Sequence, residues 1–226
     1  FRRVLFRSVT NKQRRQAVLV LAIALLLAIL VKLNFIIPVA LDGWMHSWFN
    51  SFQSNFGDVI MTIATFLGNP VVDIVYTLIL AGVLILARLR IPAVWAIITL
   101  LTGDIVLKII QFLIQRSRPV GHLIGDSSPA FPSGHVFGLF VVIFIVSILI
   151  IPNINNIAIQ FTMQWAAFLI GGLTLMSRIY FNANFFSDTI AAILFAYAWV
   201  VFAATCYAKL AKYLKARIPF FKYDEI

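Results

Sequence analysis

The chain has 226 residues, of which 62% are hydrophobic and only 12% are charged. Soluble domains carry about 25% charged residues, so this composition and a mean hydropathy of +0.99 exclude a soluble globular protein. The formal net charge is +10, but the basic residues flank the apolar runs, as topology signals and anionic-lipid contacts do. We therefore expect a polytopic membrane protein of one domain, residues 1–226, that contacts the lipid bilayer and has no nucleic-acid partner.

Six apolar runs are long enough to cross the hydrocarbon core, which takes about 20 helical residues. We expect an all-α fold with transmembrane helices at 16–37, 69–88, 92–115, 135–151, 158–177 and 187–209. The first run is too long for the apolar part of a typical signal peptide and is followed by no clear small-residue cleavage site, so we interpret it as a retained helix. Residues 1–15 form a basic segment before it, and residues 210–226 form a basic tail.

Aromatic residues recur at near-helical spacing between the first two spans. Trp44, Trp48 and Phe52 alternate there with polar residues such as Asp42. This pattern predicts an amphipathic helix at 40–56 that lies in the membrane interface with its aromatic rings at headgroup depth. A helix of an outer loop that packs on the bundle fits the pattern equally well.

Lysine and arginine in the loops predict the orientation of the chain. Both terminal segments are basic, and the turn between the second and third spans carries Arg88 and Arg90, so all three are expected in the cytoplasm. Six spans satisfy this arrangement. We expect an integral protein of the plasma membrane of a bacterial cell, whose loop after the third span and connection between the fifth and sixth spans lie outside.

Arginines end two of the spans at this outer face. The run Arg116-Ser117-Arg118-Pro119 ends the third span, and Ser177-Arg178 ends the fifth. A guanidinium group can bind phosphate through two parallel hydrogen bonds. The alternative is that these arginines only mark helix ends and reach toward the headgroups.

A Pro-Ser-Gly-His turn, residues 132–135, opens the fourth span. A helix N-terminus presents free N–H groups and a positive dipole end, which suit an anion. Ser133 can cap the helix and donate to a phosphate oxygen, and His135 can deliver a proton near neutral pH as a general acid. A capping turn with an incidental histidine is the alternative. Asp188, at the start of the sixth span, either complements the helix dipole or orients the side chain at position 184.

In order and spacing these pieces resemble the type 2 phosphatidic acid phosphatase family, the integral-membrane lipid phosphatases related to vanadium haloperoxidases. The resemblance covers roughly residues 104–192, and the six-span layout extends it to the whole chain. Family members carry a Lys-x6-Arg-Pro motif, a Pro-Ser-Gly-His motif and a Ser-Arg-x5-His-x3-Asp motif. The second motif is complete here, from Pro132 to His135. The resemblance implies a single six-helix bundle that holds a lipid phosphate.

The resemblance also assigns roles to individual residues. It implies that His135 protonates the leaving group and that Asp188 orients a nucleophilic histidine. The phosphate would be held by Arg118, Ser133, Gly134 and Arg178. Since arginines, hydroxyls and a helix end hold the anion, and no cluster has metal-ligand spacing, we expect no metal and no other cofactor.

Two motif positions depart from the family pattern. Gln111 stands where the family has lysine, and Asn184 stands where it has the nucleophilic histidine. An amide nitrogen has no available lone pair, so Asn184 cannot form the phosphoenzyme that covalent catalysis needs. Gln111 keeps hydrogen bonding but loses the positive charge that would stabilise the transition state. We therefore expect a phosphatase scaffold that is catalytically impaired.

Three hypotheses for the function follow. The first is a lipid phosphate or pyrophosphate phosphatase by lineage, acting on phosphatidate, phosphatidylglycerol phosphate or undecaprenyl pyrophosphate, in which the two altered positions silence the enzyme. The second is a natural pseudoenzyme that binds lipid phosphates as a sensor, a carrier or a partner subunit. The third is a structural or transport protein whose intramembrane charges, Asp73, Asp104 and Lys108, form an ion path.

Two further residues are weighed as replacements for the missing groups. Lys108 lies one turn before Gln111 and has a stem long enough to approach the phosphate, although an ion pair with Asp104, four residues earlier, is the expected role. His122 lies in the same outer loop as the arginines, but its spacing matches no role in the family. The sequence leaves open the oligomeric state, and whether Asn184 and Gln111 are natural.

Overall fold

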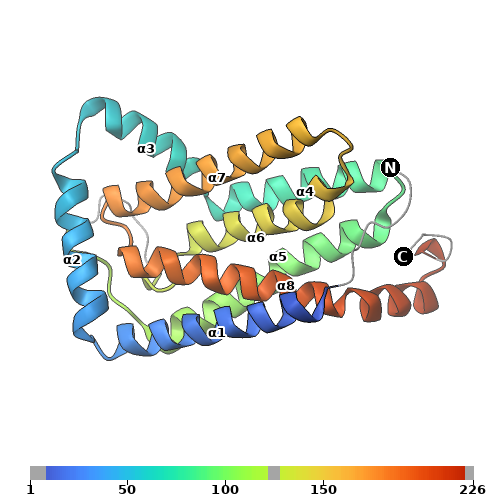
Figure 1. Ribbon diagram of the computed structural model, residues 1–226, viewed down its shortest axis with the longest axis horizontal. Helices are drawn as coiled ribbons and strands as arrows, with labels where there is room; N and C mark the ends of the chain where they lie inside the picture. Colours follow the sequence, from blue (N-terminus) through green and yellow to red (C-terminus); the bar gives the residue numbers. More distant parts are fainter. Residues whose placement is uncertain (1–8, 122–127, 222–226) are drawn as a thin grey trace.

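The computed structural model describes residues 9–121 and 128–221, and every regular element in these two ranges is helical (Figure 1). This confirms the all-α prediction. The long helices are α1 (Asn11–Lys32), α2 (Ile36–Asn50), α3 (Asn55–Leu67), α4 (Pro70–Leu86), α5 (Arg90–Ile114), α6 (Gly134–Leu149), α7 (Ile157–Tyr180) and α8 (Phe186–Arg217). Two short 3-10 helices are η1 (Ile151–Asn153) and η2 (Pro219–Phe221).

Six spans are present when a bent pair of helices is counted as one. Within the described residues, α1, α5, α6 with η1, α7 and α8 are each long and apolar enough to cross a membrane, and α3 and α4 together make a sixth span with a bend of 54°. The bend follows from the sequence, because the Asn69 side chain caps α4 and Pro70 occupies its first turn. Counted in this way, the second span begins in α3, while α4 itself falls within the predicted range 69–88.

The segment between the first two spans differs from the prediction. One helix at 40–56 was expected, but α2 ends at Asn50, and Ser54 caps a new helix by accepting a hydrogen bond from the Gly57 N–H. The first span has the predicted length but begins and ends five residues earlier than the predicted 16–37, because Asn34 adopts a left-handed conformation with φ of 50° and turns the chain after α1. The near-helical aromatic pattern thus continues across the break between α2 and α3, which the periodicity did not reveal.

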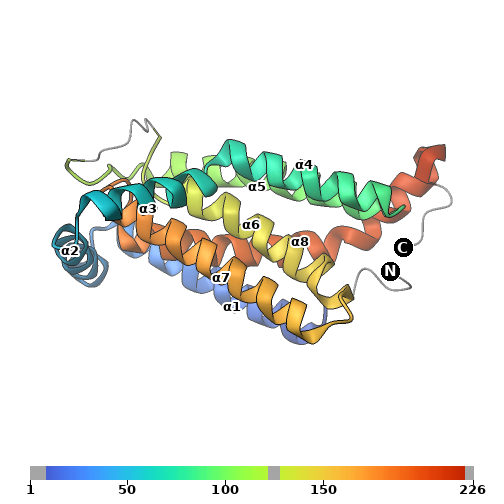
Figure 2. The ribbon, with the colours of Figure 1, turned by 90° about the horizontal axis from the view of Figure 1, so that it is seen from above.

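The bundle is built around α6 and α8, which pack on each other and carry much of the buried apolar surface (Figures 1 and 2). α1 lies along α8, α4 pairs with α5, and α3 pairs with α7. Large apolar side chains of α1, α4, α5 and α7 point outward. Outward apolar side chains on helices whose backbone polar groups are paired internally suit a surface that faces lipid.

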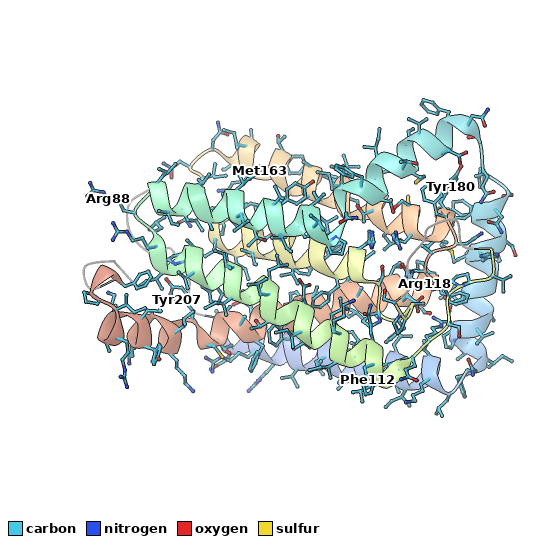
Figure 3. The ribbon with its side chains drawn as sticks, turned by 180° about the vertical axis from the view of Figure 1, so that it is seen from behind. Arg88, Phe112, Arg118, Met163, Tyr180 and Tyr207 are labelled. Atoms are coloured by element: carbon cyan, nitrogen blue, oxygen red, sulfur yellow. The ribbon has the colours of Figure 1, made fainter. Side chains whose placement is uncertain are left out.

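One end of the bundle collects the segments that the sequence marked as polar. α2 lies across this end, where α1, α5 and α7 finish and α6 and α8 begin (Figures 1 and 2). Arg118 and Tyr180 lie toward this end, while Arg88 and Tyr207 lie toward the other (Figure 3). The fold therefore brings three distant parts of the sequence together beneath α2.

Candidate functional site

The centre of the polar end is a buried hydrogen-bonded group made by one residue before α6 and two residues from the end of α7 and the turn that follows it. Ser133, Arg178 and Asn184 are 0%, 0% and 3% exposed. The Ser133 hydroxyl and the Arg178 Nε both donate to Asn184 Oδ1 over 3.1 Å. Asn184 Nδ2 donates to the Ala130 carbonyl over 2.7 Å. Two donors that were predicted to bind phosphate therefore converge on one oxygen of the chain itself.

The connection between α7 and α8 fixes position 184 by its backbone. Asn182 has a φ of 53°, a left-handed conformation that turns the chain after α7. The N–H groups of Ala183 and Asn184 then both donate to the Arg178 carbonyl, over 2.9 and 3.1 Å. Because this turn closes on Arg178 itself, the guanidinium and the side chain at 184 are held close together.

The start of α6 is tied to the start of α8. The Ser133 N–H donates to the Asp188 carbonyl over 3.2 Å, which brings the Pro-Ser-Gly-His turn against the α7–α8 connection. Ser133 is the N-cap residue of α6, but its side chain makes no capping hydrogen bond. The prediction that this hydroxyl caps the helix is therefore wrong in this structure, because the hydroxyl is turned toward Asn184 instead. Gly134 and His135 follow in the first turn of α6 and are half-buried.

Gln111, at the position of the family lysine, is buried against the same turn. Its Nε2 donates to the Pro132 carbonyl over 3.1 Å, and its Oε1 accepts from Lys108 Nζ over 3.2 Å. The predicted Lys108–Asp104 ion pair is not formed within 4 Å in the described residues, since the ammonium turns to the nearer amide oxygen on the next turn of α5. A positive charge therefore sits one hydrogen bond away from the lysine position.

Arg118 closes the group from the loop after α5. Its Nε and one terminal nitrogen donate to the carbonyl and hydroxyl of Ser128, over 2.9 and 3.1 Å. Its other terminal nitrogen donates to the Ala183 carbonyl over 2.6 Å. This places Arg118 beside Ala183, the residue that precedes Asn184, and its predicted role in phosphate binding stays a prediction.

Asp188 has a different partner from the one predicted. Its Oδ1 accepts from Arg116, and its Oδ2 accepts from the Phe185 N–H over 2.8 Å, at the start of α8. The side chain of Asn184 instead makes hydrogen bonds to Ser133, Arg178 and Ala130. The expectation that Asp188 orients the side chain at 184 is therefore not met, because both carboxylate oxygens are engaged elsewhere.

Arg116 and Asp42 also lie at the polar end of the bundle, and the sequence did not show their roles. Arg116 bridges Asp188 and Asp42, with 2.7 Å to Asp42 Oδ2, and its guanidinium lies 4.0 Å from the centre of the Phe185 ring. Asp42 also accepts from the N–H and hydroxyl of Ser187. The sequence marked Arg116 only as an interfacial arginine and Asp42 only as a polar residue between aromatics, so nothing pointed to their pairing.

Two expectations concern other parts of the chain. His122 lies outside the described residues, so its place relative to the site stays a prediction. Across residues 9–121 and 128–221, no three histidine, cysteine or acidic side chains come close enough together to hold a metal ion.

Comparison with known proteins identifies the fold family. A sequence model of the PAP2 superfamily matches residues 92–212, which is more than half of the chain and includes every candidate site residue. The chain belongs to the PAP2 superfamily. No curated protein matches the chain in a sequence search.

A PAP2 structure has the same architecture. The fold is similar to the "Crystal structure of the first transmembrane PAP2 type phosphatidylglycerolphosphate phosphatase from Bacillus subtilis", with a TM-score of 0.69 over 89% of this chain and 96% of that chain. The sequences are 19% identical, so this likeness shows the fold alone. The family and the fold together establish a PAP2-type membrane phosphatase scaffold.

Proposed function

We propose that this PAP2 chain binds the phosphate of a membrane lipid at the Ser133–Arg178–Asn184 group and turns it over poorly because Asn184 cannot act as a nucleophile. One observation carries the proposal. Two donors from different segments lie 3.1 Å from a single oxygen, Asn184 Oδ1. Donors that converge at this distance on one buried point are suited to hold an oxyanion.

The surrounding groups complete a phosphate site. Arg118 lies beside Ala183 and supplies a second guanidinium. The ammonium of Lys108 donates to Gln111 and so lies one hydrogen bond away from this group. His135 follows Ser133 at the mouth of α6, where it can reach a leaving group next to the phosphate. A lipid phosphate that enters would exchange the Asn184 amide oxygen for a phosphate oxygen as the acceptor for Ser133 and Arg178.

The impairment follows from the chemistry of position 184. A histidine there would attack phosphorus through a ring nitrogen while the bond from phosphorus to the lipid oxygen breaks. His135 would give a proton to that oxygen, and water would then hydrolyse the phosphohistidine. An amide has no nucleophilic nitrogen, so the chain as it stands can bind the phosphate but lacks the group that would receive it.

The proposal places the site at the outer face of a bacterial plasma membrane, with both termini in the cytoplasm. It is supported by the convergence of the candidate residues at the α2 end, away from the start of α1 and the end of α8 (Figure 1), and by the basic residues of both terminal segments, 1–15 and 210–226. α2 would lie in the interface. Candidate ligands are phosphatidate, phosphatidylglycerol phosphate, the lipid class named for the similar structure, and undecaprenyl pyrophosphate.

Phosphate release tests the proposal. The unsubstituted chain and the Asn184→His, Gln111→Lys double variant are purified in detergent and given a short-chain phosphatidate and an isoprenyl diphosphate. Binding of the labelled lipids is measured in parallel. We expect both proteins to bind, and only the double variant to release phosphate.

The matched control is the same double variant with Arg178→Met, which should lose binding as well as turnover because it removes one of the two converging donors. Phosphate release by the unsubstituted chain at the rate of the double variant would contradict the assigned role of position 184. Absence of lipid phosphate binding in both proteins would contradict the phosphate site itself.

A natural pseudoenzyme is the second candidate, and the contacts of Asp188 favour it. Arg116 and the Phe185 N–H engage both carboxylate oxygens, so the group that would orient a histidine at 184 is committed to another structural role. Such a protein would bind lipid phosphates as a sensor, carrier or partner subunit. Lipid binding without turnover in the double variant would support this candidate over a silenced enzyme.

A further inference from the structure

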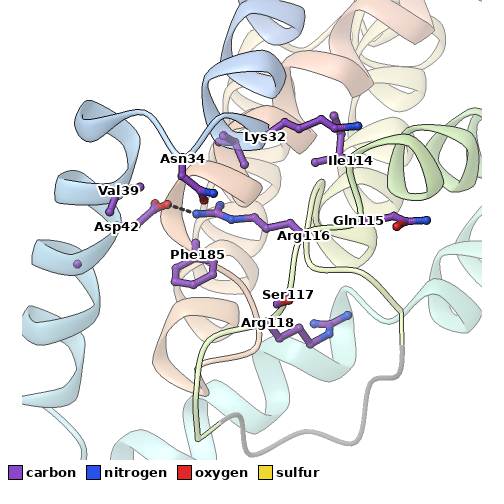
Figure 4. Close-up of a pocket in the computed structure, with 12 residues that line it drawn as sticks. Lys32, Asn34, Val39, Asp42, Ile114, Gln115, Arg116, Ser117, Arg118 and Phe185 are labelled. Atoms are coloured by element: carbon purple, nitrogen blue, oxygen red, sulfur yellow. Dashed lines mark hydrogen bonds and ion pairs between the residues drawn. The ribbon is translucent and has the colours of Figure 1, made fainter.

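A polar cavity lies beside the proposed phosphate site, between the α1–α2 turn, α2, the end of α5 and the start of α8 (Figure 4). Its volume is about 540 Å³, within the range of about 300–1,000 Å³ that is typical of small-ligand sites. Apolar side chains of α1 and α5 line part of it. The polar lining carries three cationic side chains and one carboxylate, with uncharged polar groups between them: Lys32, Arg116, Arg118, Asp42, Asn34, Gln115 and Ser117.

Two helix ends create this cavity. Asn34 after α1 and Gln115 after α5 both have left-handed backbones, with φ of 50° and 54°. At each of these residues the backbone turns away from the helix that it follows, which leaves space between the two helix ends. Lys32, in the last turn of α1, crosses this space and donates to the Leu113 carbonyl over 2.6 Å. An ammonium has three donors, and this is the hydrogen bond that Lys32 makes within the described residues.

The charges around the cavity favour an anion. Arg116 is balanced by Asp42 and Asp188, which accept from opposite ends of its guanidinium. Lys32 has no acidic partner within 4 Å in the described residues, and it faces the cavity from the side opposite Asp42 (Figure 4). Lys32 is itself exposed, as long basic side chains near helix ends are when they reach toward the headgroups, so its ammonium is open to an anion that enters from that side.

Arg118 connects the cavity to the phosphate site. It lines the cavity, and its guanidinium also donates to the carbonyl of Ala183, the residue before Asn184. An anionic group in the cavity would therefore lie on one side of Arg118 while a phosphate at Ser133 and Arg178 lies on the other. The apolar lining suits the lipid stem to which such a group is attached.

We propose that this cavity binds a second anionic oxygen group, from a lipid headgroup, beside the phosphate held by Ser133 and Arg178. The group has two sources with the same chemistry: a second phosphate of the bound lipid, or the headgroup phosphate of a neighbouring anionic lipid. The inference rests on the proposed function, since it adds a subsite to the phosphate site proposed above.

The test compares two lipids that differ by one phosphate. The full chain, in discs of neutral lipid, is titrated with a short isoprenyl diphosphate and the matching monophosphate, as the unsubstituted protein and as Lys32→Gln. The matched control is Lys12→Gln, the same substitution at the other end of the same helix. Lys32→Arg keeps the charge and should behave as the unsubstituted chain.

If the second phosphate is the source, Lys32→Gln weakens diphosphate binding roughly three- to fivefold and leaves monophosphate binding unchanged. If a neighbouring lipid is the source, the unsubstituted chain retains phosphatidylglycerol from anionic discs, measured by native mass spectrometry, and Lys32→Gln loses it. Both results support the cavity as an anion site. Lys12→Gln changes neither measurement.

Behaviour of Lys32→Gln like that of Lys12→Gln in both arms would overturn the inference and leave Lys32 as a cap for the end of α5. Equal weakening of diphosphate and monophosphate, without loss of phosphatidylglycerol, would also overturn it. Either result leaves the proposed function standing, provided that the monophosphate binds. Failure of the unsubstituted chain to bind any lipid phosphate would contradict the proposed function and this subsite together.

Discussion

Asp42 on α2 and Asp73 on α4 are buried to the same extent, at 2% and 1% exposure, but their surroundings are opposite. Asp42 accepts hydrogen bonds from Arg116 and from the N–H and hydroxyl of Ser187, over 2.7–2.8 Å. Neither carboxylate oxygen of Asp73 has a hydrogen-bond partner in the described residues. The first belongs to the polar end of the bundle, and the second belongs to the contact between α4 and α6.

The two regions accommodate a carboxyl group in different ways. At the polar end, hydrogen bonds and a guanidinium compensate the cost of burial and set the geometry of the α2, α5 and α8 ends. At the α4–α6 contact, Gly138 leaves room for the Asp73 carboxyl group because it has no side chain. A side chain at this position would overlap that carboxyl group. We therefore expect the polar end to carry function and specificity, and Asp73 to be tolerated rather than required.

The largest expected difference between the regions is in turnover. In the Asn184→His, Gln111→Lys background, His135→Ala should lower phosphate release by about 100- to 10,000-fold, because it removes the proposed general acid. Asp73→Asn in the same background should leave the rate within about twofold. Initial rates with a short-chain phosphatidate measure both. Equal losses in the two variants would show that the α4–α6 contact takes part in the chemistry.

The next effect is on stability. Asp42→Asn should lower the free energy of unfolding by about 3–5 kcal/mol, since the half-buried Arg116 loses one of its two carboxylate partners and the buried partner groups of Asp42 lose their charge-assisted hydrogen bonds. Denaturant titration in mild detergent, followed by tryptophan fluorescence, measures this loss. Asp58→Asn is the control, because that carboxylate is exposed and should cost much less. A similar loss in both variants would mean that the Arg116 bridge contributes little.

The sequence predicted the parts of this molecule that depend on local pattern. Ser133, Arg178 and position 184 meet because each lies near a helix end, and spans that alternate in direction bring the start of α6, the end of α7 and the start of α8 to one side. The Arg116–Asp42 bridge joins residues 74 positions apart, so it depends on how α2 is rotated, which an aromatic periodicity does not specify. Lys108 had acceptors one turn away in both directions, and spacing alone could not choose between Asp104 and Gln111.

A smaller effect is expected at the glycine that makes room for Asp73. Gly138→Ala should destabilise the fold by about 1–3 kcal/mol, because the new methyl group overlaps the Asp73 carboxyl group and one of the two helices must shift. The same substitution in an Asp73→Ala background should cost less than about 0.5 kcal/mol, since the overlapping atoms are gone. A double-mutant cycle from denaturant titrations gives the coupling. Additive losses would place the strain elsewhere.

The smallest effect is expected for Asp73→Asn, which keeps the size of the side chain and removes its ionisable group. Its carboxylate oxygens have no hydrogen bonds to lose, so the free energy of unfolding should change by less than about 1 kcal/mol, against the 3–5 kcal/mol expected when the paired Asp42 is changed in the same way. The two titrations are run side by side at neutral pH. If Asp73→Asn costs as much as Asp42→Asn, burial of Asp73 is compensated by an interaction other than hydrogen bonding. Asp104 on α5, which lies close enough to interact with Asp73 electrostatically, is then the first neighbour to substitute, because removing it changes the charge around Asp73 without changing the α4–α6 contact.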